Sequence, residues 1–262
     1  MTQQGAKEKS SLPDWQTQIL RCTAFVAPRT GSFSVDQAAF WWGEIAGEGL
    51  EKVISTPKEQ AVVAGGSFKD GRLMLLCQPT VVELRLQLPE GEKKRAEGTP
   101  TIGSFNELQP DFMALAHKFL STDALGPVNR IAFGAVIHLP VASMAEAYRR
   151  LTPYLPNVKL DSQNLYDLLY RCNRRRNSSV MNENLYINRV NTWTAVAFQE
   201  FYVIAGTGRA PEQAAEVFAA QLELDINTPA NYAGRLPADK LTRVFDELVA
   251  MGIEIASQGD TP

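Results

Sequence analysis

Apolar and polar residues alternate with a period of two along several stretches of the chain, a pattern that predicts half-buried β-strands. The clearest case is residues 80–88, where Val82, Leu84 and Leu86 would share one face. On this basis we expect strands at residues 15–27, 60–68, 72–77, 80–88, 129–141, 164–176, 185–190, 193–205 and 222–227. We expect the strands at 185–190 and 193–205 to be joined by a turn at Asn191-Thr192. Residues 211–220 are ambiguous between a short helix and a loop.

A period of three to four residues, typical of helices with one buried face, replaces this alternation elsewhere. Ser34 and Gln37 match a capping box and predict a helix that runs to about Val53. Ser143 and Glu146 match a second capping box, which predicts a helix ending near Leu151. Further helices are expected at residues 107–120 and after Pro237, and the charged residues 90–103 are expected to form a loop.

The order strand, helix, several antiparallel strands, helix occurs twice, although no residue-level repeat accompanies it. This order predicts an α+β fold with an antiparallel sheet, helices on one face and two similar β-α-β(n)-α halves. The halves are expected at residues 14–121 and 122–257. A disordered tail at residues 1–13 and a short tail at residues 258–262 would flank them.

Composition narrows the class of protein. The chain has 262 residues and a net charge of −3, which argues against a dedicated nonspecific DNA-binding protein. Its three cysteines are widely spaced and form no metal-ligand pattern, so we expect reduced thiols and neither a metal nor a cofactor. No apolar stretch is long enough for a membrane span and the first residues lack a signal-peptide pattern, so a cytoplasmic protein is expected.

Two strand segments resemble a sporadically distributed bacterial family of about this length whose function is uncharacterised. Arg130-Ile131-Ala132-Phe133 corresponds to that family's Arg-rich middle strand, and Leu224-Asp225-Ile226 resembles its penultimate strand before the last helix. The element order is similar from about residue 15 onward, but Gly134-Ala135-Val136 departs from the family pattern. The resemblance implies a bacterial cytoplasmic α+β protein with no established activity.

The strongest candidate for chemistry is a basic segment, RCNRRRNSS, at residues 171–179. If residues 164–176 form a strand, both of its faces change from apolar to basic near residue 171. Guanidinium groups with amides and an aromatic ring nearby suit phosphate binding and base stacking. The candidate binding residues are Arg171, Arg174, Arg175, Arg176, Asn188, Arg189 and Trp193.

Several functions remain open on this basis. The arginines could be a solvated surface paired with acids elsewhere, since residues 211–262 contain nine acidic and three basic residues. They could instead contact a protein partner or a second copy of the chain, the interpretation we favour, because complementary patches steer association. Local binding of single-stranded or structured nucleic acid is the alternative. An enzyme that uses His138 or the pair Glu223 and Asp225, which share a strand face, is the third.

Overall fold

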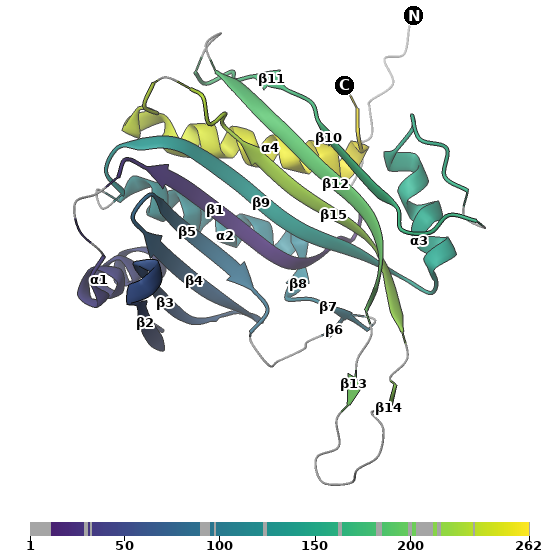
Figure 1. The fold of residues 1–262 in the computed structure, drawn as a ribbon, viewed down its shortest axis with the longest axis horizontal. Helices are drawn as coiled ribbons and strands as arrows, with labels where there is room; N and C mark the ends of the chain where they lie inside the picture. Colours follow the sequence, from purple (N-terminus) through teal and green to yellow (C-terminus); the bar gives the residue numbers. More distant parts are fainter. Residues whose placement is uncertain are drawn as a thin grey trace, which may run out of the picture.

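The computed structural model describes residues 12–28, 31, 33–89, 95–96, 98–122, 125–161, 164–181, 185–198, 201–202, 212–213, 216–232 and 234–261. These residues form an antiparallel sheet with helices packed on one face, which confirms the predicted α+β class (Figure 1). Most of the tail predicted at residues 1–13 lies outside the described residues.

The first half of the chain contributes one end of the sheet and two helices. Its elements are β1 (Gln16–Val26), α1 (Val35–Ala46), β2 (Lys52–Thr56), β3 (Ala61–Phe68), β4 (Gly71–Gln78), β5 (Val81–Gln87), β6 (Arg95–Ala96), β7 (Thr99–Pro100), β8 (Gly103–Ser104) and α2 (Phe105–Ser121). The second half repeats the order strand, helix, strands, helix. Its elements are β9 (Val128–Val141), α3 (Met144–Leu151), a 3-10 helix η3 (Thr152–Tyr154), β10 (Leu169–Asn173), β11 (Arg176–Asn177), β12 (Tyr186–Phe198), β13 (Phe201–Tyr202), β14 (Glu212–Gln213), β15 (Val217–Asn227) and α4 (Leu241–Gln258).

The two halves share one sheet. Its main path runs β10-β12-β15-β9-β1-β5-β4-β3-β2, so the first strands of the two halves, β1 and β9, lie side by side near the middle. Cys22 pairs with Phe133 and Leu84 across the two ladders of β1, and these side chains share one face. That face is covered by the helices, and α2 and α4 lie behind the sheet in the view of Figure 1.

Local sequence explains where the chain turns. Ser34 and Gln37 form the predicted capping box at the start of α1. At α3, the Ser143 side chain accepts a hydrogen bond from the Glu146 backbone N–H, but the Glu146 carboxylate accepts from Ala142 and not from the cap residue. A tight turn joins β3 and β4, with Lys69 in the left-handed region at φ 50°.

The first helix is shorter than the sequence predicts. It ends at Ala46 and not near Val53, because Gly47 adopts φ 76° and Gly49 adopts φ 91°, and these conformations turn the backbone out of the helix. Val53 belongs instead to the edge strand β2, which pairs with β3. The expected loop at residues 90–103 contains the short strands β6, β7 and β8.

The predicted strands around the basic segment also need correction. β10 covers only Leu169–Asn173 of the expected 164–176, and Asp167 just before it has a positive φ of 55°. No turn separates residues 190 and 193, because Asn191 lies buried in the middle of the continuous strand β12. β12 ends at Phe198, and Phe201–Tyr202 of the strand predicted at 193–205 form the separate strand β13. β15 starts five residues earlier than predicted, at Val217.

Candidate functional site

The basic segment lies against the C-terminal end of α4, and an acidic residue that follows this helix anchors it. Asp260 is only 2% exposed, although residues 258–262 were expected to form a tail. Its carboxylate accepts hydrogen bonds from Nε and Nη2 of Arg174 at 2.6 and 2.9 Å and from the Tyr170 hydroxyl at 2.6 Å. The Cys172 thiol lies 3.0 Å from the same carboxylate. Asp260 therefore ties the strand β10 to the end of the chain.

A second carboxylate, Glu254 on α4, holds two more of the candidate arginines. Arg176 donates to both carboxylate oxygens of Glu254, at 2.7 and 2.8 Å. Arg189, on the helix-facing side of β12, is 2% exposed and donates to Glu254 at 3.1 Å. These bonds occupy the planar guanidinium forks that would otherwise grip a phosphate.

The pKa values around Asp260 follow from this arrangement. The Arg174 guanidinium, with burial opposing it, holds the pKa of Asp260 well below its usual range. The hydrogen bond to Asp260, together with burial, raises the pKa of Tyr170 to about 12. Burial and the same carboxylate raise the pKa of the Cys172 thiol to about 11, so this thiol stays protonated at neutral pH. The pKa of Glu254 is lowered, chiefly by Arg176.

The remaining candidates are divided between the core and the surface. Trp193 is fully buried, where its ring stacks on Tyr154 at 5.1 Å and its indole N–H donates to Asn191, so it cannot stack on a base. Asn188 lies on the face of the sheet opposite to Trp193, where its side chain donates a hydrogen bond to Asn227. Arg171 and Arg175 are exposed, and no acidic partner faces them among the described residues. Within the part of the chain that the structure describes, these two are the candidate residues whose charged groups have no acidic partner.

The second candidate surface is the sheet face that the described helices leave uncovered. The backbone register places side chains from neighbouring strands in rows across this face. One row contains Arg85, Arg21, Gly134, Asp225 and Val190, from β5, β1, β9, β15 and β12. The next row contains Gln87, Ile19, Val136, Glu223 and Thr192. The face is therefore mixed in character, with charged groups beside half-buried aliphatic ones.

Arg21 has the most distinctive position on the uncovered face. Its side chain lies flat over Gly134, where an added Cβ would come within 2.0 Å of Arg21 Nε. Among the described residues Arg21 has no hydrogen-bond or ion-pair partner, in contrast to Arg85, which is 2.5 Å from Glu83. Asp225 accepts a hydrogen bond from Asn227 but has no cationic partner in the described part of the chain. Arg21 and Asp225 thus flank Gly134 with opposite charges.

His138 and the pair Glu223 and Asp225 lie on this same face, and the shared face of Glu223 and Asp225 is as the alternating pattern predicted. His138 is fully buried, its Nε2 lies 2.9 Å from the Gln221 side-chain oxygen, and Phe198 packs edge-on against its ring. Burial lowers the pKa of His138, which favours the neutral ring. Its Nδ1 has no hydrogen-bond partner among the described residues. The residues of this enzymatic alternative are thus neighbours, but the histidine is closed off from solvent.

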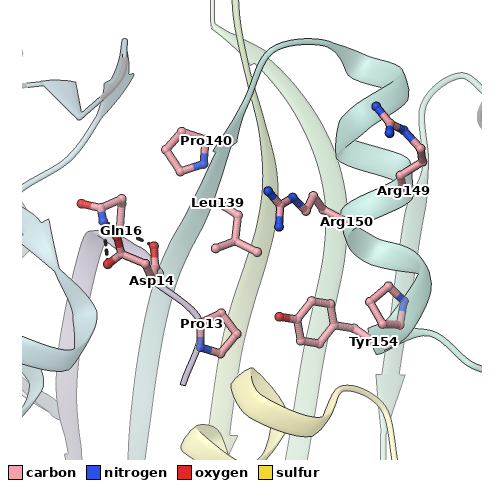
Figure 2. Close-up of a pocket in the computed structure, with 9 residues that line it drawn as sticks. Pro13, Asp14, Gln16, Leu139, Pro140, Arg149, Arg150 and Tyr154 are labelled. Atoms are coloured by element: carbon pink, nitrogen blue, oxygen red, sulfur yellow. Dashed lines mark hydrogen bonds between the residues drawn. The ribbon is translucent and has the colours of Figure 1, made fainter. Parts of the chain in front are cut away.

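A third feature is a groove of about 640 Å³ at the end of the sheet where β1 begins and β9 ends (Figure 2). Its walls come from the segment before β1, from the end of β9 and from α3 with η3. The lining residues are Pro13, Asp14, Gln16, Leu139, Pro140, Arg149, Arg150, Pro153 and Tyr154. Volumes of this size are typical of small-molecule sites.

Comparison with protein-family models, with curated proteins and with solved structures gives no significant match to this chain. The resemblance to an uncharacterised bacterial family therefore stays a prediction. Within the described residues, no cluster of three or more His, Cys, Asp or Glu side chains is placed to hold a metal ion. None of the helices in the same residues is long and apolar enough to cross a membrane.

Sequence reasoning missed the groove and the position of Arg21 over Gly134. Arg21 stands in a strand whose neighbours are mostly apolar, and a charged residue between Leu20 and Cys22 was a signal of an outward-facing cation. Its significance depends on Gly134, which lies more than a hundred residues away and is adjacent only through strand pairing. No local pattern marks the groove, since its three walls come from distant segments.

Proposed function

We propose that this protein is a non-catalytic binding protein that associates with a protein surface through the uncovered face of its sheet, and that this surface is the same face of a second copy. The observation that carries the proposal is the row in which Arg21 and Asp225 lie on either side of Gly134. Opposite charges on one face, with no ion-pair partner among the described residues, make that face complementary to itself.

The geometry of the row suits a two-fold interface, in which the same patch serves on both subunits. A two-fold axis parallel to the strands and above Gly134 exchanges the β1 side with the β15 side. Arg21 of one copy would then face Asp225 of the other, and each pair would occur twice.

The same face supplies apolar area beside these charges. Ile19 and Val136 are neighbours in the next row, and Val190 lies beyond Asp225 in the first. All three are partly exposed. An apolar centre with charged groups that fix the register is the usual composition of a protein interface.

The nucleic-acid alternative has less support. Arg174, Arg176 and Arg189 are bound to carboxylates of the chain itself, and Trp193 is buried. The uncovered face also contains Glu83, Glu223 and Asp225, which would repel a phosphate backbone.

Sedimentation velocity of the wild-type chain and of two charge-reversed variants, R21E and D225R, tests the proposal. Because each substitution places like charges together at both copies of the contact, we expect each to weaken dimerisation by about 100-fold or more. Raising the salt concentration should weaken the wild-type dimer. The matched control is R243E, because Arg243 is exposed on the helix-covered side of the molecule.

The outcomes separate the possible partners. A wild-type chain that is monomeric up to its solubility limit would contradict the second-copy assignment. If the wild-type chain is monomeric but binds a different protein, and R21E does not bind that protein, the face would be a docking site for a heterologous partner. A wild-type dimer that neither reversal affects would show that the chain associates through another surface.

A further inference from the structure

The groove of Figure 2 has opposite charges on facing walls. Asp14 stands on the β1 side, where Gln16 Nε2 donates to its backbone oxygen and to its carboxylate at 3.3 Å each. Arg150 extends into the groove from α3 on the other side, and Leu139 lies between the two. A bound molecule would therefore meet a negative group at one side, an apolar floor and a positive group at the other.

Arg150 has free hydrogen-bonding capacity. Its only ion pair in the described part of the chain is with Glu146, where Nε and Oε1 are 3.8 Å apart, too far for a hydrogen bond. The Arg150 side chain is 62% exposed, so its fork can receive a planar carboxylate from solution. Arg174 and Arg176, by contrast, already donate to two carboxylate oxygens each.

The apolar part of the groove is rigid. Tyr154 stacks on Trp193 and packs against Trp15 at 5.8 Å, so its ring is held in place by buried tryptophans. Burial raises the pKa of Tyr154, with the nearby Arg150 opposing the shift, so the hydroxyl remains a hydrogen-bond donor. The prolines among the lining residues fix their own backbone φ angles. A preformed site loses little conformational entropy when a ligand binds.

We propose that this groove binds a short zwitterionic peptide with free termini. Arg150 and the Tyr154 hydroxyl would receive its carboxylate, Asp14 its ammonium group, and Leu139 with the surrounding prolines its apolar side chains. Asp14 inside the groove and Glu146 beside Arg150 disfavour ligands with several negative charges, such as nucleotides. The volume of about 640 Å³ favours a peptide over a single amino acid. This inference is independent of the proposed function, because neither Arg21 nor Asp225 lines the groove.

Three peptides with the same body test the assignment: Leu-Phe, its N-acetyl derivative without the ammonium group, and its C-terminal amide without the carboxylate. Binding is measured by calorimetry and by the fluorescence of Trp15 and Trp193, which contact Tyr154. We expect Leu-Phe to bind the wild-type chain about fivefold more tightly than either derivative, as one exposed charged contact is lost in each.

Two variants test which side of the groove binds the carboxylate of the peptide and which side binds its ammonium group. R150Q should bind Leu-Phe and the amide equally, while it still prefers Leu-Phe over the N-acetyl form. D14N should show the opposite pattern. R243Q, at an exposed arginine outside the groove, is the control and should bind all three as the wild type does. Since Asp14 and Arg150 are both exposed, both variants should fold, which circular dichroism verifies.

Several results would overturn the proposal. Failure of all three peptides to bind at about 10 mM would exclude even a weak site of this class. Preferences that persist in R150Q and D14N would place the peptide elsewhere. An N-acetyl form that binds the wild type as tightly as Leu-Phe would assign the groove to simple carboxylates. Free leucine that binds as tightly as Leu-Phe would assign it to amino acids.

Discussion

Two sets of arginines in this protein differ in what surrounds their guanidinium groups. Arg174 and Arg176 each donate two hydrogen bonds to one carboxylate of the α4 end, and the acceptor of Arg174 is buried. Arg21 and Arg150 have no hydrogen-bond partner among the described residues, and each lies on a surface where another molecule could bind. The first set fastens the chain to itself, and the second remains able to bind another molecule.

The difference shows that density of charge along a sequence does not identify a binding surface. The run at residues 171–176 brings cations close to one another, and carboxylates nearby offset their mutual repulsion. Here the acids are Glu254 and Asp260, and they pair with two of the four arginines of the run, Arg174 and Arg176. Arg21 stands alone in an apolar strand, donates to no carboxylate among the described residues, and keeps its hydrogen-bonding capacity.

The largest expected effect comes from removing the acceptor of the first set. Asp260→Asn removes the negative charge and one of the two acceptor oxygens that Arg174, Tyr170 and Cys172 share, and we expect the free energy of unfolding to fall by about 2–3 kcal/mol. Urea denaturation measures this change in the free energy of unfolding. Asp246→Asn is the control, because Asp246 is 47% exposed and pairs only with the exposed His117 in the described structure. It should cost less than about 1 kcal/mol. Equal losses in the two variants would show that Asp260 has no special role.

A comparison within the basic run sharpens the contrast between paired and free arginines. Arg174→Ala removes both hydrogen bonds to Asp260 and should lower the free energy of unfolding by about 1–2 kcal/mol. Arg175→Ala, one position later, removes an exposed side chain and should change it by less than about 0.5 kcal/mol. Denaturation curves of the two variants measure and compare these changes in the free energy of unfolding. A larger effect at residue 175 would contradict the assignment of the internal pairs.

Acidification should weaken the same contacts. The pKa values of Asp260 and Glu254 are lowered from 3.8 and 4.5, so their contribution to stability is present above these unfolded-state values. It is lost as the pH falls through the lower folded-state values. The free energy of unfolding should therefore decrease as the pH drops below about 5, with a smaller slope in Asp260→Asn. Denaturation curves across this pH range measure both slopes, and identical slopes would exclude Asp260 as a source of the pH dependence.

A substitution at Gly134 is expected to have only a small effect on stability. In Gly134→Ala the new Cβ would meet the Arg21 side chain, which must lift away from β9. Because Arg21 is flexible, the unfolding free energy should change by no more than about 1 kcal/mol, whereas dimerisation should weaken by about tenfold. Thermal unfolding and sedimentation velocity measure the two effects. An unchanged dimer would mean that the resting position of Arg21 is irrelevant to association.

Much of the fold could be predicted from the sequence, and most of the functional geometry could not. The alternation of apolar and polar residues predicted the central strands and their buried faces, because burial on one side of a sheet imposes a period of two. It failed at Asn191, a polar residue that resembles a turn signal but satisfies its side chain by hydrogen bonds to Trp193 and to the Arg189 carbonyl. It also failed after Ala46, where glycines end a helix whose apolar pattern continues.

The candidate site depends on contacts that no local pattern contains. Arg174 and Asp260 are 86 residues apart in the chain, and Asp260 is part of a segment whose composition suggests a tail. The row of Arg21, Gly134 and Asp225 exists only because the two halves of the chain share a sheet. The excess of acidic residues near the C-terminus was the one signal that the arginines could be paired internally, and the structure brings two of those acids to them.

The most direct test of the account is sedimentation velocity of an equimolar mixture of R21E and D225R. Each variant alone should be monomeric, because like charges face each other in both copies of the contact. In a mixed dimer the reversed position 21 of one chain faces the reversed position 225 of the other, and the two unchanged residues also face each other. The account predicts that mixing restores a dimer. A mixture that remains monomeric, although both variants are folded, would contradict the pairing of Arg21 with Asp225 between two copies.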